Sequence, residues 1–149
     1  DCGKSEGRSL LSDPHLKPHR APQWQRLMEM PKLDASLNHF CKATDEAMHQ
    51  LISKQVPMLV GTDAPAPGTT YGASVHGELV LFVREGMTPI QALASATSVP
   101  ARAFRLEDRG KISPGMRADL LLVQGDPTRD IKDTRNIVAV WKRGIRVDR

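Results

Sequence analysis

Met58-Leu59-Val60-Gly61-Thr62-Asp63-Ala64 is a short apolar run that stops at an acidic residue, near the middle of a chain of 149 residues. Residues 65–68, which contain two prolines and a glycine, follow it. Apolar runs of this length bounded by Gly and Pro are typical of fully buried strands, although periodicity alone does not separate them from a piece of helix. The preceding Val56-Pro57 argues against a helix. We therefore expect a buried strand over residues 58–62.

Asp63 would then stand at the tip of this strand. In parallel α/β architectures the carboxyl ends of the strands face the active site, so a carboxylate at such an end is typical of a catalytic or metal-binding residue. An ordinary turn or N-cap aspartate is the structural alternative, because Asp is common in turns. This segment alone leaves both interpretations open.

The chain before the predicted strand has two helical candidates. Residues 23–30 form a short one that Pro31 ends. Apolar residues then recur at helical spacing over residues 34–54, with polar residues on the opposite face. The first 22 residues are rich in Pro, Ser, Lys, Arg and His and show no apolar period, so we expect a loop there.

Helical periodicity returns after the predicted strand. It covers residues 73–85, and Gly86 provides a C-cap. Thr88 and Pro89 have the pattern of an N-cap followed by proline at the first helical position. A further short helix is expected over residues 98–104.

The pattern changes at Leu106, where turn residues become frequent. Residues 119–123 have the composition of a buried strand. Residues 137–141 and 145–147 have the composition of two strands on either side of a turn at Arg143-Gly144. A helical part should therefore give way to a small β element.

Composition and charge exclude several classes of protein. The sequence is 40% hydrophobic and 4% aromatic, and its apolar stretches are far shorter than the roughly 18 residues that cross a bilayer. The net charge is +4, but the basic residues of the last third alternate with acidic ones, so we expect no nucleic-acid binding. Cys2 and Cys41 are too few for a disulfide framework or a zinc knuckle. We expect reduced thiols and a cytoplasmic protein.

The histidines offer weak metal sites. His15 and His19 are four residues apart, which suits a metal on a helix face, but Pro14 and Pro18 exclude a regular helix there. Surface positions in contact with solvent are expected for His39 and His49.

Six short motifs follow one another between about residues 56 and 149. They are Gly61-Thr62-Asp63-Ala64, Tyr71-Gly72-Ala73-Ser74-Val75-His76-Gly77-Glu78-Leu79, Gly86-Met87-Thr88-Pro89 with Ala96-Thr97, Asp108-Arg109-Gly110-Lys111-Ile112 with Pro114-Gly115, Ala118-Asp119-Leu120, and Gly125-Asp126-Pro127 with Trp141-Lys142-Arg143-Gly144. Together and in this order they resemble the C-terminal end of the amidohydrolase superfamily. The similarity is greatest to its imidazolonepropionase-like and Xaa-Pro dipeptidase branch.

The resemblance implies an α/β protein with a (β/α)8 barrel of the TIM type. On this basis residues 1–105 are expected to be the C-terminal part of the barrel, with its last strand and flanking helices. Residues 106–149 are expected to supply the return strands of a small β-sandwich domain.

The resemblance also implies a metal-dependent hydrolase, of the zinc type, acting on amide or cyclic amide carbon–nitrogen bonds. In such enzymes the aspartate that ends the eighth barrel strand binds the metal and takes the proton from the attacking water, and Asp63 matches that position. A metal lowers the pKa of bound water toward about 7, and a carboxylate within hydrogen-bond reach can then accept its proton.

The family's other metal ligands would precede everything in this chain. We therefore expect a fragment that is inactive by itself, binds no metal on its own and needs the missing N-terminal barrel portion as its partner. Alone it should expose an apolar face and associate or stay partly unfolded. The complete protein is expected to act on a small-molecule amide, away from membranes, as a homo-oligomer.

His76 follows the Gly-containing loop after Asp63 and matches a histidine common in the resembled family. It could bind substrate, although a structural histidine that caps the loop is an equal alternative. Two rival functions also stay open, since substrate choice depends on loops outside the chain. One is a deaminase or organophosphate-type hydrolase on the same scaffold, and the other is a non-catalytic subunit that only docks to a partner.

Overall fold

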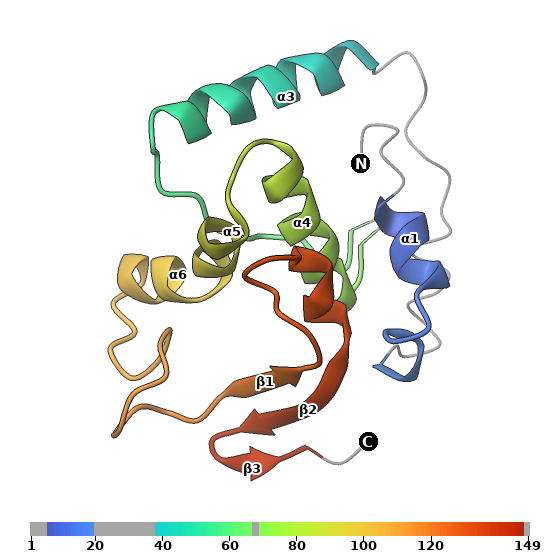
Figure 1. Cartoon of the computed structure of the whole chain (residues 1–149). Helices are drawn as coiled ribbons and strands as arrows, with labels where there is room; N and C mark the ends of the chain where they lie inside the picture. The colour runs from blue at the N-terminus through green and yellow to red at the C-terminus, as the bar shows by residue number, and fades with distance from the viewer. Residues whose placement is uncertain (1–5, 20–37, 67–68, 148–149) are drawn as a thin grey trace.

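The computed structural model describes residues 6–19, 38–66 and 69–147 (Figure 1). Within these ranges helices come first and a small sheet comes last, which confirms the predicted change of structure after residue 106. In chain order the elements are α1 (Glu6–Ser12), η1 (Lys17–His19), α3 (Asn38–Ser53), α4 (Ala73–Arg84), α5 (Pro89–Ala96), α6 (Ser98–Ala103), β1 (Leu120–Val123), η3 (Ile131–Arg135), β2 (Ile137–Lys142) and β3 (Ile145–Arg146).

Helix α4 is central to the described part of the chain (Figure 1). It contacts α1 on one side and α5 on the other, and the short helix η3 packs against both α4 and α5. Helix α3 runs across the top of the view, and the three-stranded sheet lies at the opposite end. The positions of α1, α5 and η3 therefore depend on their contacts with α4.

The sequence signals at the ends of α4 and α5 are confirmed. Gly86 follows α4 with a φ of +112°, a left-handed conformation that glycine adopts without strain, and its N–H donates to the carbonyl of Val83 at 3.1 Å. Before α5, Thr88 Oγ1 accepts the N–H of Gln91 at 3.2 Å, and the Gln91 side chain accepts the N–H of Thr88 at 2.8 Å. This reciprocal capping box, with Pro89 at the first helical position, fixes where α5 begins.

The main hydrophobic core forms where α4 meets α5 and η3. Its buried members are Leu79, Val80, Phe82, Ala92 and Ile131. Burial of a leucine or phenylalanine side chain contributes about 1.5–3 kcal/mol relative to exposure, so these contacts outweigh any local helix propensity. The core therefore holds the two helices that flank the candidate site.

Residues 58–62 do not form the predicted buried strand. Segment 56–63 has neither helix nor strand structure, and Met58, Leu59 and Val60 are only half-buried. A strand needs a neighbouring strand to accept its N–H groups. In the described ranges the N–H of Val60 instead donates to the carbonyl of Ser95 in α5 at 3.0 Å. The apolar run thus covers helices, with Met58 and Val60 packed against the main core.

The sheet at the end of the chain is antiparallel in the order β1-β2-β3. Leu120 of β1 lies opposite Trp141 of β2, and β2 continues into β3 through Arg143-Gly144, whose φ values of +53° and +79° are typical of a tight hairpin turn. The predicted hairpin is confirmed. The expected full burial of the first strand is wrong, because Leu121 and Leu122 are each 48% exposed and no described residues cover them.

Three short helices were not predicted. The first 22 residues were expected to be a loop, but α1 lies there and η1 follows it. Two leucines, Leu10 and Leu16, are 3% and 1% exposed and form a second core with Ala73 of α4. A pair of apolar anchors is too few to give a period in the sequence. The other missed helix is η3, which lies between β1 and β2.

The remaining fold expectations have mixed outcomes. Helix α3 confirms the predicted 34–54 helix for its described part, whereas residues 34–37 and the 23–30 candidate lie outside the described residues. The described chain contains helices and one small antiparallel sheet, and its barrel portion stays a prediction, as does a domain boundary between residues 105 and 106. No helix within the described ranges is both long and apolar enough to cross a bilayer.

Gly125 provides a test of the turn that leads from β1 to η3. Its φ is +105°, and a Cβ there would collide with the carboxylate of Asp133, which accepts the N–H of Asp126 at 2.8 Å. We expect Gly125→Ala to lower the free energy of unfolding by about 1–2 kcal/mol for the left-handed backbone and by a further 1–3 kcal/mol or so for the collision. Urea unfolding followed by tryptophan fluorescence measures the loss.

Gly115→Ala is the matched control for this prediction. Gly115 has a φ of +81°, but no atom lies within 4 Å of the position that its Cβ would take. The control should therefore show only the backbone cost. Equal losses of stability in the two variants would contradict the role of the Asp133 carboxylate.

Candidate active site

Asp63 ends segment 56–63 at the surface of the molecule. Its backbone has a φ of +49°, a left-handed conformation that aspartate tolerates better than most residues. The Asp63 carbonyl accepts the N–H of Ala66 at 2.9 Å, which closes a turn immediately after the segment. The side chain is exposed, so its carboxylate is available to a cation or to the proton of a water molecule.

Glu78 of α4 holds the backbone two residues before Asp63. Its Oε1 accepts the N–H of Gly61 at 3.0 Å. Its Oε2 is buried and has no hydrogen-bond partner among the described residues. Burial raises the pKa of this carboxyl group above its ordinary value, and the hydrogen bond from Gly61 partly offsets that effect. Glu78 was not among the site residues predicted from the sequence. The one sequence feature that could have identified it is its place two residues after His76.

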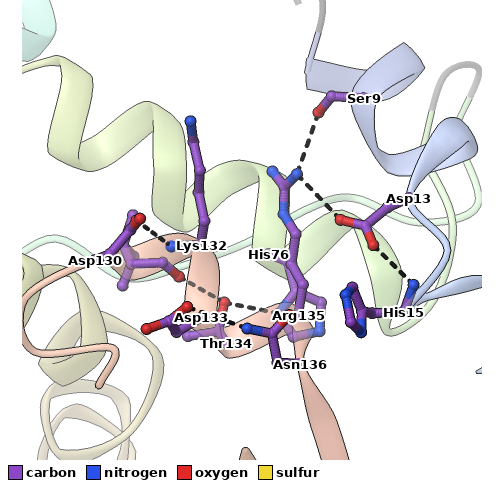
Figure 2. Close-up of polar contacts among 11 residues, drawn as sticks. Ser9, Asp13, His15, His76, Asp130, Lys132, Asp133, Thr134, Arg135 and Asn136 are labelled. Carbon is purple, nitrogen blue, oxygen red and sulfur yellow. Dashed lines mark hydrogen bonds and ion pairs between the residues drawn. The ribbon is translucent and has the colours of Figure 1, made fainter. Parts of the chain in front are cut away.

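His76 lies on α4 with its imidazole buried, 7% exposed (Figure 2). Its Nδ1 lies 3.0 Å from the Oγ1 of Thr134 in η3. The hydroxyl of Thr134 donates its single proton to the carbonyl of Ile131 at 2.8 Å. The Thr134 hydroxyl must therefore accept a hydrogen bond from the imidazole. This assigns the proton of the neutral ring to Nδ1. The partner of His76 is thus η3 and not the loop that the structural alternative proposed.

A buried arginine adjoins the histidine (Figure 2). The Nη1 of Arg135 lies 3.5 Å from Asp13 Oδ2, and the two side chains are 8% and 14% exposed. The same Nη1 donates to the hydroxyl of Ser9 in α1 at 3.4 Å. This polar cluster, composed of Ser9, Asp13, His76, Thr134 and Arg135, joins the first helix of the chain to η3. Of these five residues, His76 was the one predicted from the sequence as a candidate site residue.

The environment of His76 keeps its ring neutral. Burial, followed by the positive charge of Arg135, lowers the pKa of His76 to about 4, while the negative charge of Asp13 acts in the opposite direction. An imidazole that is neutral at pH 7 can accept a hydrogen bond at Nε2 but cannot supply a positive charge.

The other histidines have the following positions. Residues 14–16 form a turn and residues 17–19 a 3-10 helix, which confirms that His15 and His19 do not share the face of a regular helix. His49 lies at the surface as expected, with its side chain 59% exposed, and its Nε2 also lies 3.2 Å from the Oε2 of buried Glu85. The side chains of His19 and His39 lie outside the described residues.

The described residues do not form a metal site by themselves. No group of three or more His, Cys, Asp or Glu side chains within them could hold a metal ion. A zinc site takes at least three protein ligands. In the described ranges Asp63 is the candidate that could contribute one of them.

The sequence pattern of the amidohydrolase family matches residues 15–147. The chain belongs to the amidohydrolase family. The match spans both the Asp63 turn and the sheet at the end of the chain, so it confirms the resemblance that the six motifs indicated. Members of this family of hydrolases are generally metal-dependent.

Individual relatives cover parts of the chain. It is 40% identical over 74 residues to an adenine deaminase of Lysinibacillus sphaericus, which covers 50% of the chain and 12% of that enzyme. It is 36% identical over 110 residues to an imidazolonepropionase of Streptomyces griseus, covering 71% of the chain and 28% of that enzyme. A solved structure of a Xaa-Pro dipeptidase with bound methionine in its active site superposes with a TM-score of 0.62 and 33% identity, over 70% of this chain and 25% of that one.

The chain therefore spans between 12% and 28% of the length of these proteins. The similarities establish the family of the chain. Because the chain spans so little of these proteins, the similarities do not establish the activity, substrate or partners of a whole protein.

The buried neutral histidine predicts a loss of stability in acid. Its pKa is about 4 in the folded protein and 6.5 as the ordinary value, so between these pH values the unfolded chain binds more protons at this position. Stability should fall as pH drops from 6.5 to 4, by on the order of 3 kcal/mol for this one group. Urea unfolding at pH 7 and at pH 4 measures the difference.

His76→Asn is the comparison variant, because it keeps an N–H donor near Nδ1 but does not titrate. Its stability should depend less on pH than that of the parent protein, and subtraction removes the contribution of all other groups. If the parent and the variant lost the same stability between pH 7 and pH 4, the burial of a neutral imidazole would be contradicted.

Proposed function

We propose that the chain is the C-terminal part of a metal-dependent amidohydrolase that cleaves amide or cyclic amide carbon–nitrogen bonds in a small substrate. Membership of the family supports the reaction class. The observation that carries the proposal is the exposed carboxylate of Asp63, presented by a left-handed turn directly after a partly buried apolar segment. This is the position at which the resembled family has its catalytic aspartate.

In this proposal Asp63 has two roles, as metal ligand and as general base. Asp63 would be one of the ligands of a divalent metal, zinc in our proposal, which would lower the pKa of a bound water toward about 7. The Asp63 carboxylate accepts a proton from the attacking water and then delivers it to the leaving nitrogen. The exposed position of the Asp63 side chain leaves it accessible for these roles.

The remaining parts of the site would come from outside the described residues. We propose that an N-terminal barrel portion supplies the other ligands, that residues 1–105 complete the barrel, and that residues 106–149 contribute strands to a β-sandwich domain. The chain alone would then be inactive. A homo-oligomer is part of the same proposal, and so is the small-molecule amide substrate.

A deaminase is the second candidate function. The 40% identity to an adenine deaminase over 74 residues, half of this chain, favours it. Release of ammonia distinguishes deamination from cleavage of an amide that yields a carboxylate and an amine. An organophosphate-type hydrolase and a non-catalytic docking subunit stay as further alternatives without an observation that favours them.

Substrate binding by His76 also stays a prediction. The burial of the ring and its bond to Thr134 favour a structural role, with η3 as the partner instead of the loop. If His76 binds substrate, His76→Asn should change KM or kcat at pH 7 without a change in the free energy of unfolding. A structural role predicts the reverse, a loss of stability with kinetic constants kept in the molecules that remain folded.

Asp63→Asn tests the central assignment in the full-length protein that carries this chain. The substitution keeps the shape of the side chain but removes the base, so activity should fall by roughly 10² to 10⁴-fold. The probes are a Xaa-Pro dipeptide, imidazolone propionate and adenine, each assayed with added zinc. The matched control is Asp108→Asn, an exposed aspartate whose carboxylate binds the neighbouring Arg109. Full activity of Asp63→Asn would overturn the assignment.

A further inference from the structure

Segment 56–63 is held from two helices through consecutive backbone N–H groups. The N–H of Val60 donates to the carbonyl of Ser95 near the end of α5 at 3.0 Å, and the N–H of Gly61 donates to the Glu78 carboxylate of α4 at 3.0 Å. The Ser95 carbonyl is one of the last in its helix, which lack partners inside the helix. The Val60 contact thus joins two backbone groups, whereas the Gly61 contact depends on the side chain of Glu78.

The contact with Glu78 lies close to the candidate catalytic residue. Gly61 precedes Asp63 by two residues, and on the other side of Asp63 the turn is closed by the bond from Ala66 to the Asp63 carbonyl. Gly61 itself is exposed, and no atom lies within 4 Å of the position of a Cβ there, so side-chain packing does not restrain it. The hydrogen bond that the Gly61 N–H donates to the Glu78 carboxylate is therefore the side-chain contact that limits the movement of Gly61.

The direction of Glu78 is fixed by its neighbours on α4. Leu79 is 3% exposed in the main core, and His76 is bonded to Thr134 of η3. Because these two residues prevent α4 from rotating, the Glu78 carboxylate is presented to segment 56–63. Hydrogen bonds to a charged acceptor are shorter and roughly twice as strong as neutral ones, so a carboxylate is an effective clamp for a backbone N–H.

We propose that Glu78 is a positioning residue for Asp63, which holds the Gly61 N–H and thereby sets the direction in which the Asp63 carboxylate leaves the chain. This proposal rests on the proposed function of Asp63. It gives Glu78 no contact with substrate or with the reacting atoms. Its role differs from that of a general fold stabiliser, because removal of the carboxylate should loosen one turn and leave the core of α4 and α5 in place.

The direct test is hydrogen exchange at the Gly61 amide in the full-length protein. In Glu78→Ala the exchange rate of this amide should rise at least tenfold, while amides of α5 exchange as in the parent. Glu78→Gln keeps an oxygen acceptor at nearly the same place and should bring the rate to within about threefold of the parent. Glu107→Ala, the control for removal of an exposed glutamate, should leave the rate unchanged.

Kinetics then connect the loosened turn to Asp63. With the substrate that is turned over among the three probes named above, kcat of Glu78→Ala should fall at least tenfold with KM within about twofold. Glu78→Gln should recover most of the loss. A purely structural role would lower the amount of folded protein in Glu78→Ala and leave kcat per folded molecule unchanged, which would overturn the proposal.

The failures of the two proposals can be told apart. Full activity of Asp63→Asn, or turnover of none of the three probes, overturns the proposed function and with it the catalytic purpose of the Glu78 contact. An unchanged Gly61 exchange rate in Glu78→Ala overturns the positioning role while Asp63→Asn is still inactive. A rise in exchange over the whole of α4 and α5 also overturns it, because Glu78 would then stabilise the fold in general.

Discussion

The packing of helix α4 on opposite sides is the constraint on which the candidate site depends. Leu79 lies in the core shared with α5 and η3, whereas Ala73 packs against the leucines of α1 and its following turn. A helix anchored on two faces cannot rotate without opening one of two cores. The polar side chains between those anchors therefore have fixed directions. His76 meets Thr134, and Glu78 meets the backbone before Asp63.

The polar cluster beside α4 adds specificity to this packing. A buried arginine is costly unless it is paired, and Arg135 has Asp13 and Ser9 as partners from the other end of the chain. The neutral state of His76 fits this arrangement, because a second positive charge beside Arg135 would be repelled. The Thr134 hydroxyl accepts from the ring and donates to the carbonyl of Ile131, so its proton and one of its lone pairs are used. Through Ser9 and Asp13, this network connects α1 and the residue that follows it to η3.

The sequence predicts the locally determined parts of this structure well. The Thr88 N-cap of α5, the glycine after α4 and the hairpin at Arg143-Gly144 depend on residues a few positions apart, and all three are confirmed. The prediction of a strand over residues 58–62 is wrong because strand pairing depends on neighbours that are distant in the sequence. Helices α1 and η3 were not predicted because few apolar residues anchor them. In the site, Asp63 and His76 stood out by motif, whereas Glu78 has the spacing of any polar residue on an amphipathic helix and becomes notable only through its contact with Gly61.

The family match and the metal requirement together define what this chain can contribute. A zinc site takes at least three protein ligands, and the described residues contain no cluster of that size. If Asp63 supplies one ligand, its value to the complete site depends on how well its position is defined, since catalytic groups must be held within about 0.5 Å of the productive geometry. An exposed turn after an irregular segment would not achieve this alone. The hydrogen bonds to Ser95 and Glu78 connect that turn to two helices that share a core, so the position of the carboxylate follows from the packing of α4 and α5.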